Sequence, residues 1–303
     1  MSGEMASASG DTLFRDSGSG GLPRRPQAPR TVAPWRRNRK GLDARDLWRF
    51  PGARAAAYAV IAYLYIPILV LVVLSFNASD SSLARWQGFT THWYAMVAAD
   101  NNMMSSIWNS LIVASCAAPI GTVIATLAAL GTTRTRFRGK LAIEALIGLP
   151  LIVPDIVAAI AILLLFVMIG IKLGLVSLVL AHTVFAIPIA YLPIRARLEG
   201  LDPSLAEAAA DLYATPWQSL RRIILPLIWP GILSGAMLAF IGSLGDVVIS
   251  YFVSGPGSTT LPVYVFSMVR MGVTPAVNAI STLVVAVSMS ILTVSYLLGR
   301  RFI

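Results

Sequence analysis

The sequence is poor in charge and holds a single cysteine. Only 13% of its 303 residues are Asp, Glu, Lys or Arg, against about 25% in an average soluble domain. The lone Cys116 cannot form an internal disulfide and has no partner at metal-ligand spacing, which excludes a disulfide scaffold. There is also no G-x-x-x-x-G-K-[ST] phosphate loop. The chain therefore does not bind ATP through that motif.

Apolar residues take the place of the missing charge. Hydrophobic residues make up 56% of the chain, and the mean hydropathy is +0.74. A water-soluble shell cannot cover so much apolar surface, so the composition indicates an integral membrane protein. Six stretches are long enough to cross about 30 Å of hydrocarbon, and helices are expected because a spanning segment must satisfy its own backbone hydrogen bonds. They are Ala56–Phe76, Ile107–Gly131, Ile143–Ile169, Val176–Ile194, Leu227–Phe252 and Ala276–Gly299. We therefore predict an all-α membrane protein with six transmembrane helices.

The net charge of +10 is distributed in a way that predicts orientation. With the N-terminal segment in the cytoplasm, 21 of the 24 Lys and Arg residues fall on the cytoplasmic side. Only Arg85, Lys172 and Arg270 remain outside. Because cytoplasmic loops carry an excess of Lys and Arg, we expect both termini to be cytoplasmic. Topology and anionic lipid headgroups then explain the basic surplus, and no nucleic-acid partner is expected.

Residues 1–54 differ in composition from the rest of the chain. They are rich in Ser, Gly, Pro and Arg, and they hold eleven basic against five acidic residues. This composition predicts a disordered basic cytoplasmic tail. A transit peptide is the weaker interpretation, because such peptides are poor in acids. Residues 55–303 are predicted to form one transmembrane domain.

The predicted cytoplasmic loop over residues 195–226 carries helix signals. Asp202-Pro203 and Thr215-Pro216 each have the order of a helix start, an N-cap residue followed by proline. We therefore expect two short helices with a break near Tyr213. A structured loop on this side favours a docking surface for a cytoplasmic partner. An amphipathic segment lying on the lipid is an equally open interpretation.

The stretch Glu207-Ala208-Ala209, followed at Ile223 by I-I-L-P, resembles the EAA loop of ABC-importer permeases. That family's pattern is EAA, three residues, Gly, nine residues and I-x-L-P, and this sequence keeps the spacing with Tyr213 at the glycine position. In the family this loop forms coupling helices that sit in a groove of a cytoplasmic ATPase. The resemblance therefore implies a type I ABC-importer permease fold in a bacterial inner membrane. It also implies a set of ATPase-coupling residues, namely Glu207, Ala208, Ala209, Asp211, Tyr213, Ile223, Leu225 and Pro226.

Further segments most resemble the spermidine/putrescine branch of these permeases. They are Ser75-Phe76-Asn77, Phe137-Arg138-Gly139-Lys140, Pro154-Asp155-Ile156-Val157, Ser254-Gly255-Pro256-Gly257 and Met271-Gly272-Val273-Thr274-Pro275. The resemblance implies a dimeric ATPase, a second permease subunit in a heterodimer, and an extracytoplasmic substrate-binding protein as partners. It implies neither a catalytic site nor a cofactor or metal in this chain. The branch typically has two adjacent acids near Asp246, and Gly245 stands where the first of them would be.

Three acids fall within predicted spans: Glu144, Asp155 and Asp246. A charge inside the bilayer costs at least about 2.5–3.5 kcal/mol, so such residues usually face a bundle interior or a wet cavity. Glu144 follows Lys140 by four residues, which predicts a local ion pair. Counted from the inner end of their spans, Asp155 lies about 18 Å and Asp246 about 28 Å deep. Both are therefore expected in the outer half of the membrane.

The two deep acids suit a cationic substrate. Carboxylates match ammonium groups, and nearby Tyr251 and Phe252 can add cation–π attraction. We therefore predict a substrate pathway containing Asp155, Asp246, Tyr251 and Phe252. The alternative is that each acid caps an unwound helix segment. For His182, a bundle-facing histidine with satisfied hydrogen bonds is favoured over a proton relay.

Together these features predict a permease subunit that imports polyamines by alternating access, driven by a separate ATPase. Another small amino compound, such as an amino acid or an aminophosphonate, is the alternative substrate. A self-sufficient channel or secondary transporter would not need an ATPase. An intramembrane aspartic enzyme, with Asp155 and Asp246 as its dyad, would leave the docking loop unexplained.

Overall fold

The computed structural model describes residues 52–79, 86–135, 137–272 and 274–300. The chain divides into two units, Met1–Tyr58 and Ala59–Ile303. Of the first unit only residues 52–58 are described, so the predicted tail lies almost wholly outside the described residues. Apart from the start of the helix that begins at Ala53, all of the described helices belong to the second unit.

Every regular element among the described residues is a helix. The one strand-like contact in this part of the chain is an isolated antiparallel bridge between Asn77 and Phe89. In chain order the helices are α2 (Ala53–Leu74), α3 (His92–Ala99), α4 (Asn101–Arg134), α5 (Lys140–Ile152), α6 (Asp155–Met168), α7 (Leu175–Glu199), α8 (Ser204–Asp211), α9 (Pro216–Ser219), η1 (Leu220–Ile224), α10 (Leu225–Gly245), α11 (Val248–Val253), α12 (Leu261–Met271) and α13 (Pro275–Arg300). The all-helical prediction is therefore confirmed for the described residues.

Four helices are long and apolar enough to cross a membrane. They are Arg54–Leu74 of α2, all of α4, all of α7, and the continuous stretch Pro216–Gly245 that α9, η1 and α10 form together. The bent pair α5 and α6 makes a fifth if it counts as one span. The apolar parts of α12 and α13, the latter counted over Pro275–Ser290, are shorter. The structure thus supports four or five of the six predicted spans.

The predicted span Ile143–Ile169 is bent and consists of two helices. Helix α5 ends at Ile152, α6 begins at Asp155, and their axes differ in direction by 109°. The physical reason is Pro154, whose ring disfavours a helical conformation in the residue before it. Val153 accordingly has extended angles, φ −73° and ψ 132°.

The predicted span Leu227–Phe252 is also interrupted. Helix α10 ends at Gly245, Asp246 is extended with φ −71° and ψ 126°, and α11 begins at Val248. Each of the two breaks therefore has a carboxylate beside it, Asp155 at one and Asp246 at the other.

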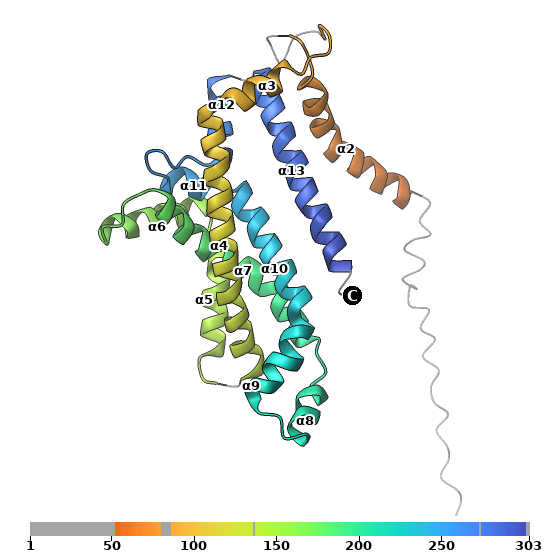
Figure 1. Cartoon of the computed structure of the whole chain (residues 1–303), viewed down its shortest axis with the longest axis vertical. Coiled ribbons are helices and arrows are strands. Elements are labelled where there is room, and N and C mark those ends of the chain that lie inside the picture. The colour runs from red at the N-terminus through yellow and green to blue at the C-terminus, as the bar shows by residue number, and fades with distance from the viewer. Residues whose placement is uncertain (1–51, 80–85, 136, 273, 301–303) are drawn as a thin grey trace, which may run out of the picture. The chain divides into compact units, whose positions relative to one another are not determined.

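The packing core is built where α4, α7 and α10 touch through small residues. A Cβ on Gly121 of α4 would lie 2.6 Å from Ala186 Cβ of α7, and a Cβ on Gly235 of α10 would lie 2.8 Å from Ala190 O. The backbones can approach this closely because these positions lack side chains, as is common where helices associate in lipid. Helices α8 and α9 lie at one end of this group, and α3 and α12 lie at the other (Figure 1).

Candidate functional site

A cavity of about 210 Å³ lies beside the two helix breaks and contains both deep acids. Asp155 lines it from the start of α6, and Asp246 lines it from the link between α10 and α11. The other polar members are His182 of α7 and Ser243 of α10, while the remaining wall is mostly apolar and includes Phe185. Segments far apart in the sequence thus place two carboxylates around one space.

Asp246 is held by the helix that follows it. Its Oδ2 accepts a 2.8 Å hydrogen bond from Ser250 N, and its Oδ1 accepts a 3.4 Å bond from Ile249 N. These bonds satisfy donors that the first turn of α11 would otherwise leave unpaired. The Asp246 side chain is 18% exposed, and its Oδ2 lies 3.6 Å from His182 Nε2. The carboxylate is therefore fixed in orientation and still reaches the cavity.

His182 joins three helices at this point. Its ring is buried, with Nδ1 2.7 Å from Ser243 Oγ and Nε2 3.0 Å from Ser250 Oγ. Both ring nitrogens thus have hydroxyl partners, on α10 and on α11. This confirms a bundle-facing histidine with satisfied hydrogen bonds.

Asp155 has a more open environment. It is the first residue of α6 and is exposed in the isolated chain. Among the described residues, no Lys, Arg or His forms an ion pair with it. Within the same part of the chain, no group of three or more His, Cys, Asp or Glu residues is placed to hold a metal ion. A carboxylate without a cationic partner next to a cavity is available to a cation that enters it.

The predicted aromatic members of the pathway lie elsewhere. Tyr251 and Phe252 are on α11 but are not among the residues that line this cavity. Tyr251 is half exposed and packs edge-to-face on Phe252, with ring centroids 5.7 Å apart. The aromatic ring at the cavity is that of Phe185, which was not predicted from the sequence. The available signal was its spacing of three residues from His182, which puts both on one face of a helix.

The loop between α7 and α10 is built from local capping interactions. Asp202 Oδ1 accepts a 2.9 Å hydrogen bond from Ser204 N at the start of α8, and this bond lowers the pKa of the exposed Asp202 carboxyl. Thr215 caps α9, where its Oγ1 accepts a bond from Gln218 N and the Gln218 side chain accepts one from Thr215 N. The two short helices expected from the sequence are therefore confirmed.

Helix α8 ends in a pair of reversed hydrogen bonds. Tyr213 N donates to Ala210 O at 2.9 Å, and Ala214 N donates to Ala209 O at 3.0 Å. This is a Schellman motif, in which the residue at the Tyr213 position is left-handed and usually glycine. Tyr213 has a φ of 58°, which costs an L-residue about 1–2 kcal/mol. The tyrosine thus adopts the backbone conformation that a glycine would adopt without this cost.

The other residues predicted to couple to an ATPase differ in their exposure. Glu207, Ala208, Asp211 and Tyr213 are on the surface, whereas Ala209 is buried. Ile223 and Leu225 are half-buried and Pro226 is exposed, where η1 passes into α10. The loop therefore presents an acidic and apolar surface on a base that is continuous with α10.

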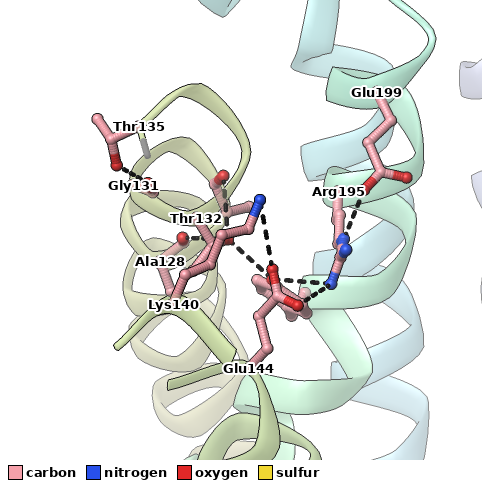
Figure 2. Close-up of polar contacts among 10 residues, drawn as sticks. Ala128, Gly131, Thr132, Thr135, Lys140, Glu144, Arg195 and Glu199 are labelled. Carbon is pink, nitrogen blue, oxygen red and sulfur yellow. Dashed lines mark hydrogen bonds and ion pairs between the residues drawn. The ribbon is translucent and has the colours of Figure 1, made fainter. Parts of the chain in front are cut away.

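A cluster of charges ties α5 to α7 near the same end of the molecule (Figure 2). Glu144 lies 3.8 Å from Lys140 Nζ, which confirms the predicted local pair. It also lies 3.3 Å from Arg195 of α7, whose Nε donates a 2.7 Å hydrogen bond to Glu199. The pairing with Arg195 joins helices distant in sequence, so spacing alone could not predict it.

Comparison with known proteins places this architecture in a family. Residues 119–303 match the model of the binding-protein-dependent transport system inner membrane component. The spermidine/putrescine transport system permease protein PotC of Escherichia coli is 41% identical over 242 residues, covering 80% of this chain and 91% of PotC. The putrescine transport system permease protein PotI of the same species is 44% identical over 229 residues, covering 73% of this chain and 81% of PotI.

Solved structures of ABC transporters share the fold. A bacterial ABC transporter involved in the import of the acidic polysaccharide alginate aligns with a TM-score of 0.66 at 15% identity, over 83% of this chain and 96% of that one. An inward-facing structure of the MetNI methionine ABC transporter aligns with a TM-score of 0.60 at 20% identity, over 66% of this chain and 96% of that one. The chain therefore belongs to the inner-membrane permease components of binding-protein-dependent ABC importers.

Proposed function

We propose that this permease carries polyamines, cations such as spermidine and putrescine, into the cytoplasm by alternating access. The observation that carries the proposal is the cavity shared by Asp155 and Asp246. Relatives named for spermidine/putrescine and putrescine transport support the choice of substrate.

The chemistry of the cavity matches that of a polyamine. Such a molecule alternates ammonium groups with short methylene chains. Asp155 and Asp246 supply two negative charges, and the Phe185 ring and the aliphatic wall can take up the methylene segments. Within a membrane, paired opposite charges also reduce the cost of holding a carboxylate away from water.

The rest of the importer comes from other chains. In this proposal the chain has six spans with both termini and a disordered basic tail in the cytoplasm. A second permease subunit completes the pathway, and a binding protein delivers substrate from outside. A cytoplasmic ATPase pair docks on the loop over residues 195–226, where Glu207 pairs with basic groups of the ATPase.

The helix Pro216–Gly245 offers a direct route for coupling. One end carries the docking loop, and the other end leads to Asp246. Closure of the ATPase pair on ATP binding would move α8 and α9, and the continuous helix would transmit that movement to the cavity. The outer half then opens toward the loaded binding protein.

Uptake by the complete importer in proteoliposomes tests the cation site. Asp155→Asn and Asp246→Asn should each raise the KM for radiolabelled spermidine, because each removes one negative charge from the cavity. Glu199→Gln is the matched control, since it neutralises an exposed acid at the far end of α7. A wild-type KM in both aspartate variants would contradict the cation site. The same assay with an amino acid or an aminophosphonate tests the alternative substrates.

Docking has a separate test. Glu207→Ala should reduce spermidine-stimulated ATP hydrolysis and uptake while the permease still reaches the membrane. Unchanged uptake would remove Glu207 from the docking surface. Purification of the wild-type permease without any ATPase subunit would favour a self-sufficient transporter.

A further inference from the structure

His182 lies beside the carboxylate to which the proposed substrate would bind. Its Nε2 is 3.6 Å from Asp246 Oδ2, and both residues line the cavity of about 210 Å³. Histidine is the side chain whose charge ordinarily changes between about pH 5 and pH 8. Helix α7 thus places a group that can be neutral or positive against an acid of the cation site.

The hydrogen bonds of the ring fit both of its protonation states. Nδ1 is 2.7 Å from Ser243 Oγ, and Nε2 is 3.0 Å from Ser250 Oγ. A serine hydroxyl can donate or accept and turns to suit its partner. In the neutral ring, one nitrogen donates to a serine and the other accepts from one. In the imidazolium both nitrogens donate, and Asp246 balances the charge. Gaining a proton therefore costs the ring no hydrogen bond.

The charges that share the cavity with His182 are negative. Asp155 and Asp246 line it, and no Lys or Arg is among the described residues that do. Of the two acids, Asp246 is the one within ion-pair distance of the ring in the described part of the chain. A protonated His182 would therefore bring positive charge to Asp246 and leave Asp155 unpaired.

Other titratable groups around α7 lie away from this cavity. Cys116 of α4 and Tyr251 of α11 are exposed, Lys172 is in the link before α7, and none of the three lines the cavity. Helix α10 carries no titratable residue. The rest lie toward the opposite end of α7, from Tyr191 onward, which is about 14 Å beyond His182 along the helix. They are Arg134 of α4, Lys140 and Glu144 of α5, and Arg195, Arg197 and Glu199 of α7.

We propose that His182 is a resident counter-ion of Asp246. It takes up a proton while no substrate occupies the cavity, and it releases that proton when a substrate ammonium group reaches Asp246. The proton comes from water in the cavity and returns to water, so the only bond that forms or breaks is one N–H bond of the ring. The inference rests on the proposed function and adds a regulation to it, because proton and substrate compete for one carboxylate.

Charge balance inside the membrane favours this exchange. An unpaired carboxylate is costly there, so Asp246 gains from a cationic partner both before the substrate binds and after it leaves. Two cations against one carboxylate repel each other, so a bound ammonium group disfavours the imidazolium. The ring can stay in place, because the two serines hold it in either state. Low pH should therefore weaken substrate binding at Asp246 and have less effect at Asp155.

The protonation of His182 can be measured directly in the complete importer. The importer is labelled with ¹³Cε1-histidine and placed in nanodiscs, and the His182 resonance is the one that is missing from the His182→Asn variant. Without substrate, we expect this resonance to titrate between about pH 5.5 and pH 8. In Asp246→Asn it should remain at the position of a neutral ring. Asp155→Asn is the matched control, because it removes the cavity acid that is not paired with the ring, and the titration should persist. A resonance that does not move with pH, or one that titrates equally in Asp246→Asn, would overturn the counter-ion.

Competition with the substrate is measured by spermidine uptake into proteoliposomes at pH 7.5 and pH 5.5. A competing proton with the ordinary histidine pKa of about 6.5 raises the KM about tenfold over this interval. We expect the rise in the wild type to exceed that in His182→Asn and His182→Gln at least about threefold. Both variants keep an amide that can bond the serines, and the comparison cancels the pH effects of the partner subunits.

The outcomes separate this inference from the proposed function. The same pH dependence of the KM in the wild type and in both His182 variants would overturn the competition alone, provided that Asp246→Asn raises the KM at pH 7.5. If neither Asp155→Asn nor Asp246→Asn changes the KM at pH 7.5, the proposed cation site fails and the competition fails with it.

Discussion

The contact between Gly255 and Leu173 offers a sharp test of how the links beside α11 and α7 support the cavity. The link from α11 to α12 passes directly over the link from α6 to α7. A Cβ on Gly255 would meet Leu173 O and would lie 2.5 Å from Leu173 C, where real Cβ atoms do not approach within 3.0 Å. Because both obstructing atoms are backbone, Gly255→Ala forces the two segments apart by about 1 Å.

The expected cost depends on the contacts that this displacement disturbs. Overpacking of a close contact costs about 1–3 kcal/mol. Ser177 Oγ donates a 3.1 Å hydrogen bond to Val253 O across the same junction, and its loss adds about 1 kcal/mol. Val253 ends α11, the helix that Asp246 caps at its other end. The substitution should therefore lower stability and also move the Asp246 carboxylate.

Gly257→Ala is the matched control. Gly257 has a φ of 74°, but a Cβ there has no neighbour within 4 Å, so its cost is only the backbone strain of about 1–2 kcal/mol. Thermal unfolding in detergent and spermidine uptake by the assembled importer measure both variants. Gly255→Ala should lower the unfolding midpoint more than Gly257→Ala and raise the KM more. Equal effects, or a larger effect of Gly257→Ala, would refute the reasoning from the close contact.

Three further changes test other contacts. Glu144→Gln should destabilise the permease by about 1 kcal/mol, because it removes one of the two carboxylates that pair with the half-buried Arg195 guanidinium while Glu199 remains, and a double-mutant cycle with Arg195→Met should measure their coupling. Tyr264 donates a 2.5 Å hydrogen bond to Asp100, which lowers the pKa of that carboxyl and raises the pKa of Tyr264 to about 12. Tyr264→Phe should therefore lower the free energy of unfolding by its full amount between pH 3.8 and pH 10.0, the ordinary pKa values of the two groups. The loss should become smaller below pH 3.8 and again as the pH rises from 10.0 toward about 12. Unfolding measured in a pH series checks both limits. His182→Ala should clearly raise the KM for spermidine and change expression little, because the link between α10 and α11 loses its support. An unchanged KM would limit His182 to a packing role.

The loop over residues 195–226 was predictable because its signals are local. The Asp202-Pro203 and Thr215-Pro216 pairs each act within one turn of helix, so they specify α8 and α9 without help from distant residues. The spacing of the loop also located the turn near Tyr213. The left-handed conformation of Tyr213 was not determined by the sequence, since tyrosine itself disfavours it and the hydrogen bonds of Ala210 and Ala209 impose it.

The long helices were predicted as apolar segments, and the size of their bends was not predicted. Hydropathy reports only that a stretch prefers lipid, and Ile143–Ile169 is apolar on both sides of its 109° bend. Pro154 marked a place where the helix could break, but the angle depends on the packing of α6 against α11. The link between Glu144 and Arg195 was missed for the same reason, because it depends on how α5 lies against α7 (Figure 2).

Asp155 and Asp246 are widely separated in depth only if their spans are straight. Counting 1.5 Å per residue along such spans puts the two acids about 10 Å apart in depth. That count assumes continuous helices, and both helices break beside these very residues. Asp246 caps α11, and a carboxylate is well suited to this because it accepts the free backbone N–H groups of a new helix start. The sequence presents capping and substrate binding as alternatives, but they are compatible at Asp246. The helix break that needs a cap also interrupts the helix and opens the space that both acids share.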